Sequence, residues 1–157
     1  MTGTGDADPN DNPTLSSIPA GGVIYGTPID DIPLNGTTAA EAIFGLTGND
    51  TINGNGGNDL IYGQQGDDSL IGGVNNDNLY GGSGVDNITG GLGADTIYGG
   101  WGADILTGNA GNDRFVFLSL ADTNDTITDF VSGADKLNFS AIDANSTSPS
   151  TNDVFTA

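Results

Sequence analysis

Apolar residues recur at every ninth position between Gly45 and Val116. This segment divides without insertion into eight nonapeptides, and each has glycine first, aspartate sixth and Ile, Leu or Phe eighth. In the last three positions of each unit, the apolar eighth side chain should face inward and the seventh and ninth should face outward, as in a strand with one buried side. The pattern predicts short strands separated by glycine-rich turns, with an inner ladder at Ile43, Ile52, Ile61, Leu70, Leu79, Ile88, Ile97, Leu106 and Phe115.

A second period lies inside the first, because aromatic residues occupy the ninth position of alternate units. From Phe44 onward their spacing is 18 residues. Two nonapeptides therefore form one turn of a coil, with odd and even units in two opposite sheets. We expect an all-β fold, a right-handed parallel β-roll with 18 residues per turn. The aromatic residues should stack on one outer face, as a row of Tyr25, Phe44, Tyr62, Tyr80 and Tyr98.

The repeat is regular only in the middle of the chain. We expect a polar N-terminal segment at 1–20, degenerate repeats at 21–44, the β-roll at 45–116, and a C-terminal cap with a candidate secretion signal at 117–157. Irregular terminal repeats are typical of solenoids, because these units close the stack. Polar and apolar residues alternate over 125–130, which predicts a few antiparallel strands covering the open end.

The composition indicates cations as partners. The chain has 20 aspartates, one glutamate and two basic residues, and its formal charge is −19. This charge argues against nucleic acid and anionic membranes as partners. Cysteine and histidine are absent, which excludes disulfides, histidine-based metal sites and histidine general bases. No apolar stretch is long enough to span a membrane, and the N-terminus does not read as a secretory signal peptide.

The sixth-position aspartates are the candidate metal ligands. Glycine at the first, second and fourth positions allows a turn whose carbonyl oxygens point alternately to the turns above and below. With the aspartate carboxylates, stacked turns would enclose an all-oxygen cage of about six ligands, which suits calcium. Asp67 should face solvent, and Asp125 is a candidate for an additional ion. The predicted ligands are Asp50, Asp59, Asp68, Asp77, Asp86, Asp95, Asp104 and Asp113.

The nonapeptides follow the pattern G-G-x-G-x-D-x-U-x, so residues 45–116 resemble RTX (haemolysin-type) calcium-binding proteins. The resemblance implies that each ion lies between one turn and the turn two repeats further on, with six full sites in all. It also implies type I secretion by a bacterium, and the C-terminal region resembles the closing region of serralysin-type exoproteins. The implied pairs are Asp50 with Asp68, Asp59 with Asp77, Asp68 with Asp86, Asp77 with Asp95, Asp86 with Asp104, and Asp95 with Asp113.

The ions should be structural. One buried aliphatic per nine residues makes a thin core, and eight carboxylates in close rows repel one another. We therefore predict that the array is disordered without calcium and folds as calcium binds. A flexible Gly/Asp-rich linker is the simplest alternative, but a linker has no reason to keep an apolar residue at every ninth position.

The sequence favours a secreted structural protein of the cell surface or matrix over an enzyme, because identical repeated carboxylates build no single catalytic pocket. The aromatic row and the outward Trp101 are candidate contacts for self-assembly or for a matrix partner. One alternative is a calcium-dependent folding and secretion module of a larger exoenzyme. Ice binding is a further alternative, but the Thr and Asn row that it requires occurs only at Thr47 and Asn49.

Overall fold

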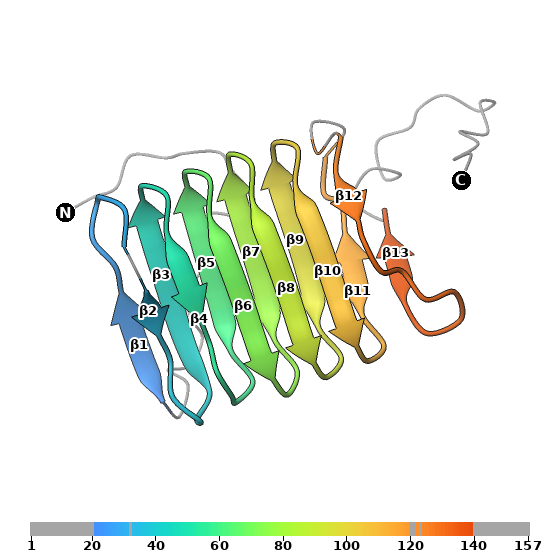
Figure 1. Cartoon of the computed structure of the whole chain (residues 1–157), viewed down its shortest axis with the longest axis horizontal. Coiled ribbons are helices and arrows are strands. Elements are labelled where there is room, and N and C mark those ends of the chain that lie inside the picture. Colours follow the sequence, from blue (N-terminus) through green and yellow to red (C-terminus); the bar gives the residue numbers. More distant parts are fainter. Residues whose placement is uncertain (1–20, 32, 120–121, 123, 140–157) are drawn as a thin grey trace.

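The computed structural model describes residues 21–31, 33–119, 122 and 124–139, and every regular element within them is a β-strand (Figure 1). The N-terminal segment 1–20 and most of the candidate secretion signal lie outside these residues. The strands are β1 (Gly22–Tyr25), β2 (Leu34–Asn35), β3 (Glu41–Thr47), β4 (Thr51–Asn53), β5 (Leu60–Gln65), β6 (Ser69–Val74), β7 (Asn78–Ser83), β8 (Asn87–Leu92), β9 (Thr96–Trp101), β10 (Ile105–Ala110), β11 (Arg114–Val116), β12 (Thr126–Ile127) and β13 (Lys136–Asn138).

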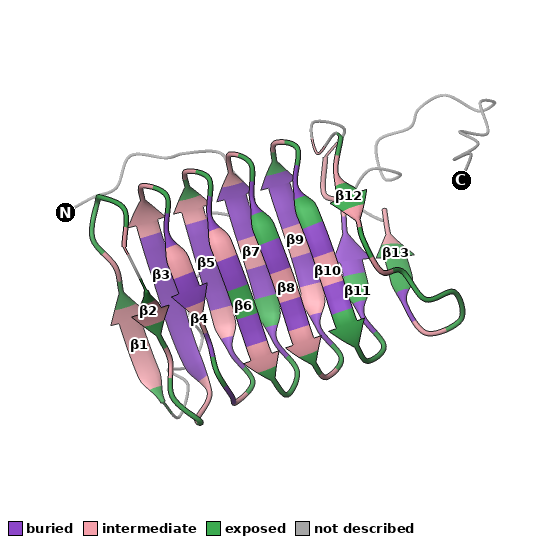
Figure 2. Cartoon of the chain, in the orientation of Figure 1, coloured by how far each residue is buried: buried purple, intermediate pink, exposed green. Residues whose placement is uncertain are grey.

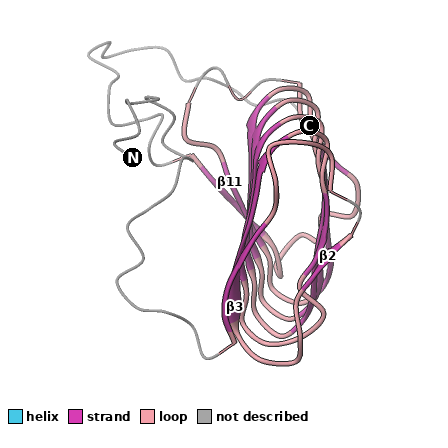
Figure 3. Ribbon diagram, turned by 90° about the vertical axis from the view of Figure 1, so that its left-hand side faces the viewer, coloured by secondary structure: helices cyan, strands magenta, loops and turns pink. Residues whose placement is uncertain are grey.

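The strands form two parallel sheets. Odd-numbered strands make a seven-stranded sheet in the order β1-β3-β5-β7-β9-β11-β13, and even-numbered strands make a six-stranded sheet in the order β12-β10-β8-β6-β4-β2. Seen along the stack, the two sheets face each other and turns join them at both edges (Figure 3). Ile61 pairs with Leu79, and Leu70 pairs with Ile88, in each case 18 residues further on. The predicted parallel β-solenoid with two nonapeptides per turn is confirmed.

The core is a single ladder of eighth-position side chains between the sheets. All nine predicted members are at most 1% exposed. In Figure 2 bands of buried residues cross the strands from β3 to β11. At the ends of the ladder, Ile24, Leu34, Phe117 and Ile127 pack against it and are only partly buried. The core is continuous but one side chain wide, so each rung contacts mainly the rungs beside it.

Truncating a central rung should therefore be costly. Leu79 is fully buried, and Leu79→Ala is expected to lower the free energy of unfolding in saturating calcium by about 2 to 5 kcal/mol, from lost burial and the cavity left behind. Urea unfolding followed by circular dichroism measures this loss. The control is Leu92→Ala, because Leu92 is 57% exposed. Equal losses for the two variants would contradict this account of the core.

The predicted aromatic row is confirmed, and part of it is more buried than expected. Consecutive ring centroids from Tyr25 to Tyr98 lie 5.3, 5.2, 4.6 and 4.3 Å apart, and every pair is stacked. Phe44 is 2% and Tyr62 1% exposed, whereas Tyr25 is 65% exposed. Phe44 and Tyr62 form a second apolar cluster with Ala42, and Val23, Leu46, Leu60 and Tyr80 pack around it.

The C-terminal strands correct the sequence prediction. β12 pairs with β10, and β13 pairs with β11, both in parallel, so the expected antiparallel strands are wrong. The chain instead extends each sheet by one more strand. Residues 130–138, FVSGADKLN, are a further nonapeptide with Gly133 fourth, Asp135 sixth and Leu137 eighth. The sequence prediction missed this unit because residues 117–129 shift its register and Phe130 and Val131 replace the leading glycines.

Candidate metal centre

The sixth-position aspartates form two ladders, one at each edge where turns join the sheets. Within a ladder, the backbone N–H of each aspartate donates to Oδ1 of the aspartate 18 residues later. Asp50 donates to Asp68 and Asp59 to Asp77, each at 2.8 Å. The same bond joins Asp68 to Asp86, Asp77 to Asp95, Asp86 to Asp104, and Asp95 to Asp113, at 2.8 to 2.9 Å. The structure therefore brings together all six pairs that the resemblance implied.

Both ladders extend beyond the eight regular repeats. At the N-terminal end, the N–H of Asp31 donates to Asp50, and that of Glu41 donates to Asp59. At the C-terminal end, Asp104 donates to Asp125 and Asp113 donates to Asp135, both at 3.0 Å. Of the added rungs, Asp125 was a predicted candidate, and Glu41 lies within the segment 21–44 that was predicted to hold degenerate repeats. Asp31 was missed as a ladder residue because its unit, residues 26–35, has ten residues instead of nine, and Asp135 was missed because residues 117–129 shift the register.

The second carboxylate oxygen is buried and unpaired in every regular repeat. All eight predicted aspartates are at most 2% exposed, and their Oδ2 atoms have no hydrogen-bond partner in the structure. A buried anionic oxygen without a partner is costly, and such atoms normally bind a hydrogen-bond donor or a cation. Asp125 Oδ2 has the same character. Among the described residues, the rows of Oδ2 atoms are therefore the strongest indication of a ligand.

In five of the eight regular repeats, a backbone carbonyl lies beside the unpaired carboxylate oxygen. A side chain placed on Gly45 would collide both with Asp50 Oδ2 and with the carbonyl oxygen of Gly63, one turn further on. The same two kinds of oxygen surround Gly54, Gly63, Gly72 and Gly81. Glycine is thus required at the first position, because the space that a Cβ would fill lies between oxygens of successive turns. This space is where a cation would be held.

Fourth-position glycines pack tightly against the turn one coil earlier. Gly84 has a φ of +131°, and a Cβ there would collide with the carbonyl oxygen of Gly66 in the turn below. Asn75 takes the glycine position in one repeat with a φ of +82°, which agrees with the tolerance of asparagine for left-handed conformations. The turns are therefore held in one shape by crowding as well as by hydrogen bonds.

The donor set fits calcium. Each gap offers two carboxylates and otherwise backbone carbonyls, and all-oxygen sets of this kind favour hard divalent ions. Among the described residues no group of three or more acidic side chains lies close enough to hold a metal by itself. Backbone carbonyls would therefore have to complete the coordination of a bound ion.

Burial of the carboxylates changes their acidity. Loss of hydration raises the pKa of Asp86 to about 8 and that of Asp77 to about 7, and repulsion between neighbouring aspartates adds to the increase. Loss of hydration likewise raises the pKa values of four further aspartates to about 6: Asp59, Asp68, Asp95 and Asp104. A hydrogen bond from a backbone N–H opposes the increase in each case.

Acid should partly replace calcium in stabilising the fold. These raised pKa values lie above the ordinary value of 3.8, so between about pH 4 and pH 8 the metal-free fold binds protons that the unfolded chain does not. Stability of the metal-free fold is therefore greatest below about pH 4 and falls as the pH rises to about 8. In EDTA, far-UV circular dichroism should show more β-structure at pH 4.5 than at pH 8. Light scattering identifies aggregates, and a soluble sample whose β signal falls on acidification would contradict this prediction.

Other predicted residues lie outside the gaps. Asp67 is exposed, as expected, and its Oδ1 accepts a bond from the N–H of Val85 at 2.7 Å. Trp101 is 40% exposed at the end of β9. Thr47 and Asn49 lie at the end of β3 and in the turn that follows. No helix in the described part of the chain is long and apolar enough to cross a membrane.

Comparison with known protein families agrees with this geometry. The family model described as RTX calcium-binding nonapeptide repeat matches four times, at residues 35–70, 44–79, 55–88 and 80–115. Together these matches span 35–115, just over half of the 157 residues. No curated protein matches the chain. The family matches end at residue 115 and give no support for a serralysin-type cap. The stacked turns, the paired aspartates and the family match lead to one conclusion: the chain belongs to the RTX calcium-binding nonapeptide repeat family and is a calcium-binding β-roll.

Proposed function

We propose that this protein is a secreted, non-catalytic structural component of a bacterial surface or matrix, whose β-roll folds when calcium binds. The observation that carries the proposal is the row of buried Oδ2 atoms without partners in the eight regular repeats. Eight such charges cannot be accommodated at neutral pH by a core one side chain wide. Calcium is thus part of the fold rather than an accessory.

Six full sites would lie between successive turns in the two ladders. The carboxylates of Asp50, Asp68, Asp86 and Asp104 would hold the ions of one ladder, and those of Asp59, Asp77, Asp95 and Asp113 would hold the ions of the other. When bound, calcium supplies positive charge that offsets most of the formal charge of −19. The aspartates keep successive turns in register, because each also accepts a backbone N–H from the turn before.

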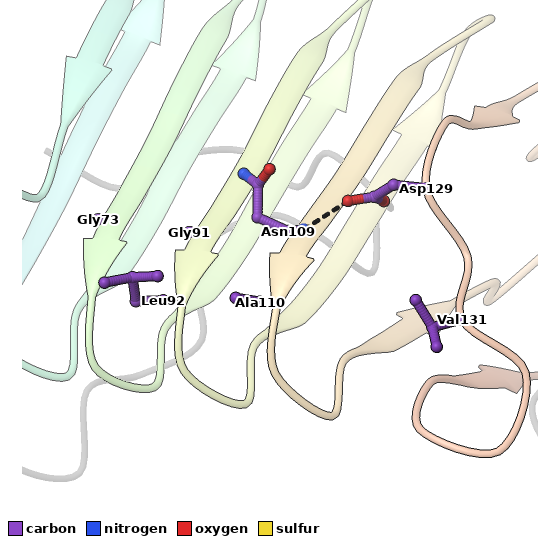
Figure 4. A pocket seen from close by; sticks show the side chains of 7 residues that line it. All are labelled: Gly73, Gly91, Leu92, Asn109, Ala110, Asp129 and Val131. Atoms are coloured by element: carbon purple, nitrogen blue, oxygen red, sulfur yellow. Dashed lines mark hydrogen bonds between the residues drawn. The ribbon is translucent and has the colours of Figure 1, made fainter.

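The surface supports a role without catalysis. A hollow of about 530 Å³ lies beside β8 and β10 and is lined by Gly73, Gly91, Leu92, Asn109, Ala110, Asp129 and Val131 (Figure 4). Its single acid, Asp129, accepts hydrogen bonds from the backbone N–H groups of Gly108 and Asn109 at 2.9 and 2.7 Å. This carboxylate is already engaged, and no second acid or nucleophile lines the hollow with it. The lining provides no acid–base pair.

Self-assembly is the structural role that the aromatic row favours. Tyr25 is the most exposed member at 65%, and it lies in β1, at one end of the seven-stranded sheet. Large exposed aromatic groups are common in protein contacts. We infer that further copies or matrix partners contact the roll at this end of the row. Secretion of such a component agrees with the family and with the acidic composition.

Sedimentation velocity in calcium tests the proposed assembly. The chain is expected to increase in mass with concentration only when calcium is present, and Tyr25→Ser should weaken this increase. The matched control is Tyr98→Ser, at the half-buried end of the row. A folded chain that stays monomeric in calcium at every protein concentration would instead support the alternative of a folding and secretion module. A catalytic domain encoded upstream of Met1 would support that alternative as well.

A further inference from the structure

The second residue of a turn, four residues before the ladder acid, adopts one of two conformations in the turns where the structure describes it. In the turns of the eight aspartates with unpaired Oδ2 atoms, this residue has a positive φ. It is glycine in four of these turns, and in the other four it is Leu46, Asn55, Gln64 or Asn109, with φ between 64° and 88°. In the turns of Asp31, Glu41 and Asp135 it is β-branched and has no positive φ. Positive φ is strongly disfavoured for β-branched residues.

The conformation decides where the second-position N–H points. In the three β-branched turns this group donates to the ladder acid of its own turn. Thr27 N–H donates to Asp31 Oδ2 at 2.6 Å, Thr37 N–H to Glu41 Oε2 at 3.0 Å, and Val131 N–H to Asp135 Oδ2 at 2.7 Å. The Thr37 hydroxyl also bonds to Glu41 Oε1. In the eight positive-φ turns no such bond forms, and Oδ2 has no partner.

From these two geometries we propose that the second-position residue decides whether a rung of the ladder binds a cation. A positive-φ residue turns its N–H away and leaves the carboxylate oxygen to the ion. A β-branched residue directs its N–H to that oxygen and satisfies it without metal. This inference rests on the proposed calcium binding, and it identifies the residues that decide which ladder acids take part in that binding. We call the acids of the second kind amide-capped rungs: Asp31, Glu41 and Asp135.

The amide-capped rungs lie at the ends of the described ladders. Glu41 is fully buried and would be as costly as the central aspartates if it lacked partners, yet Thr37 supplies two donors. Asp135 is 8% exposed and is capped by Val131. Terminal units of a solenoid have a neighbour on one side only, so a cation at the open side would receive oxygen ligands from a single turn. Capping by the chain itself therefore closes three of the four ladder ends without an ion, and the fourth end is Asp125, whose Oδ2 has no partner.

Two adjacent glutamines provide a matched test of this role. Gln64 has a φ of +79° and precedes Asp68 by four residues, whereas the exposed Gln65 has no positive φ. Gln64→Val should cap Asp68 and lower the calcium bound at saturation by one ion per chain. Gln65→Val should bind as much calcium as the unchanged protein. Equilibrium dialysis with radioactive calcium counts the ions, and circular dichroism verifies that each variant is folded.

Two adjacent threonines provide the reverse test. Thr37→Gly removes the hydroxyl donor to Glu41 and permits the positive φ that turns the remaining N–H away from Oε2, which lies beside Gly36 together with the carbonyl oxygen of Gly54. This variant should gain one calcium ion per chain, whereas Thr38→Gly should gain none. Equal counts within both pairs, in folded protein that binds calcium, would overturn the inference and leave the proposed function intact. An unchanged protein that binds no calcium would instead overturn the proposed function.

Discussion

Chelation of calcium at neutral pH is expected to convert the folded chain to a largely disordered one. At pH 7.5, excess EDTA should abolish the far-UV circular dichroism signal of β-structure, and added calcium should restore it. The reason is electrostatic: without the ions, the Oδ2 atoms of the eight regular repeats are buried without a partner or a compensating charge. The thin core returns too little free energy to offset this repulsion together with the loss of chain entropy.

Magnesium provides the control for this experiment. It prefers near-ideal octahedral geometry and loses its water reluctantly, so at equal concentration it should not restore the β signal. A chain that stays fully folded in EDTA at pH 7.5 would contradict calcium-dependent folding. Full restoration by magnesium at the same concentration would show that screening of charge, rather than a built site, stabilises the turns.

Asp68→Asn is expected to have the largest effect among conservative single substitutions. Asp68 belongs to two consecutive pairs, since its Oδ1 accepts the N–H of Asp50 and its own N–H donates to Asp86. The amide of asparagine keeps the acceptor Oδ1 but replaces the buried anionic Oδ2 with a donor. About two of the six proposed ions should be lost, because a calcium site depends on the charge and number of its ligands. The calcium concentration at the folding midpoint should rise at least tenfold.

Asp67→Asn is the matched control, because it removes the same charge one residue away. Asp67 is exposed, and asparagine retains the oxygen that accepts the Val85 N–H. Its ion count should equal that of the unchanged protein, and its folding midpoint should stay within twofold. Calcium titration by circular dichroism together with equilibrium dialysis compares the two variants. Equal effects would show that net charge, and not position in the ladder, governs calcium binding.

The sequence predicts the central roll because its signals there are strictly periodic. A strict nine-residue repeat identifies both the inward eighth position and the aspartate ladder, and an aromatic residue at alternate ninth positions reveals two strands per turn. The structure confirms these features down to the pairing of Tyr62 with Tyr80. Each depends on local spacing, which a single sequence contains in full. The role of the aspartates as calcium ligands stays a prediction residue by residue.

The ends were harder to predict because their pairing depends on contacts that spacing does not reveal. Alternation over 125–130 identifies an extended segment but does not identify its partner, and the parallel pairing of Thr126 with Ile105 was not foreseen. The burial of Phe44 and Tyr62 on an outer face also escaped prediction. It depends on Val23, Leu46 and Leu60, which pack around them from neighbouring strands.

The positive φ of the second-position residues was also not predicted from the sequence. Glycine at this position indicates that the backbone can adopt positive φ, but Leu46 and Gln64 adopt positive φ as well. This conformation costs about 1 to 2 kcal/mol for a residue with a Cβ. Such strain persists only when the surroundings impose it. The repeating turn fixes this conformation through its neighbours above and below, so no single nonapeptide reveals it.

An anomalous difference map from crystals grown in calcium tests the central claim most directly. The account predicts one calcium peak between the members of each of the six aspartate pairs, from Asp50 with Asp68 to Asp95 with Asp113. It predicts no peak between Asp31 and Asp50. A map of the intact roll with no peaks between the paired turns would contradict the claim that calcium bridges carboxylates one coil apart.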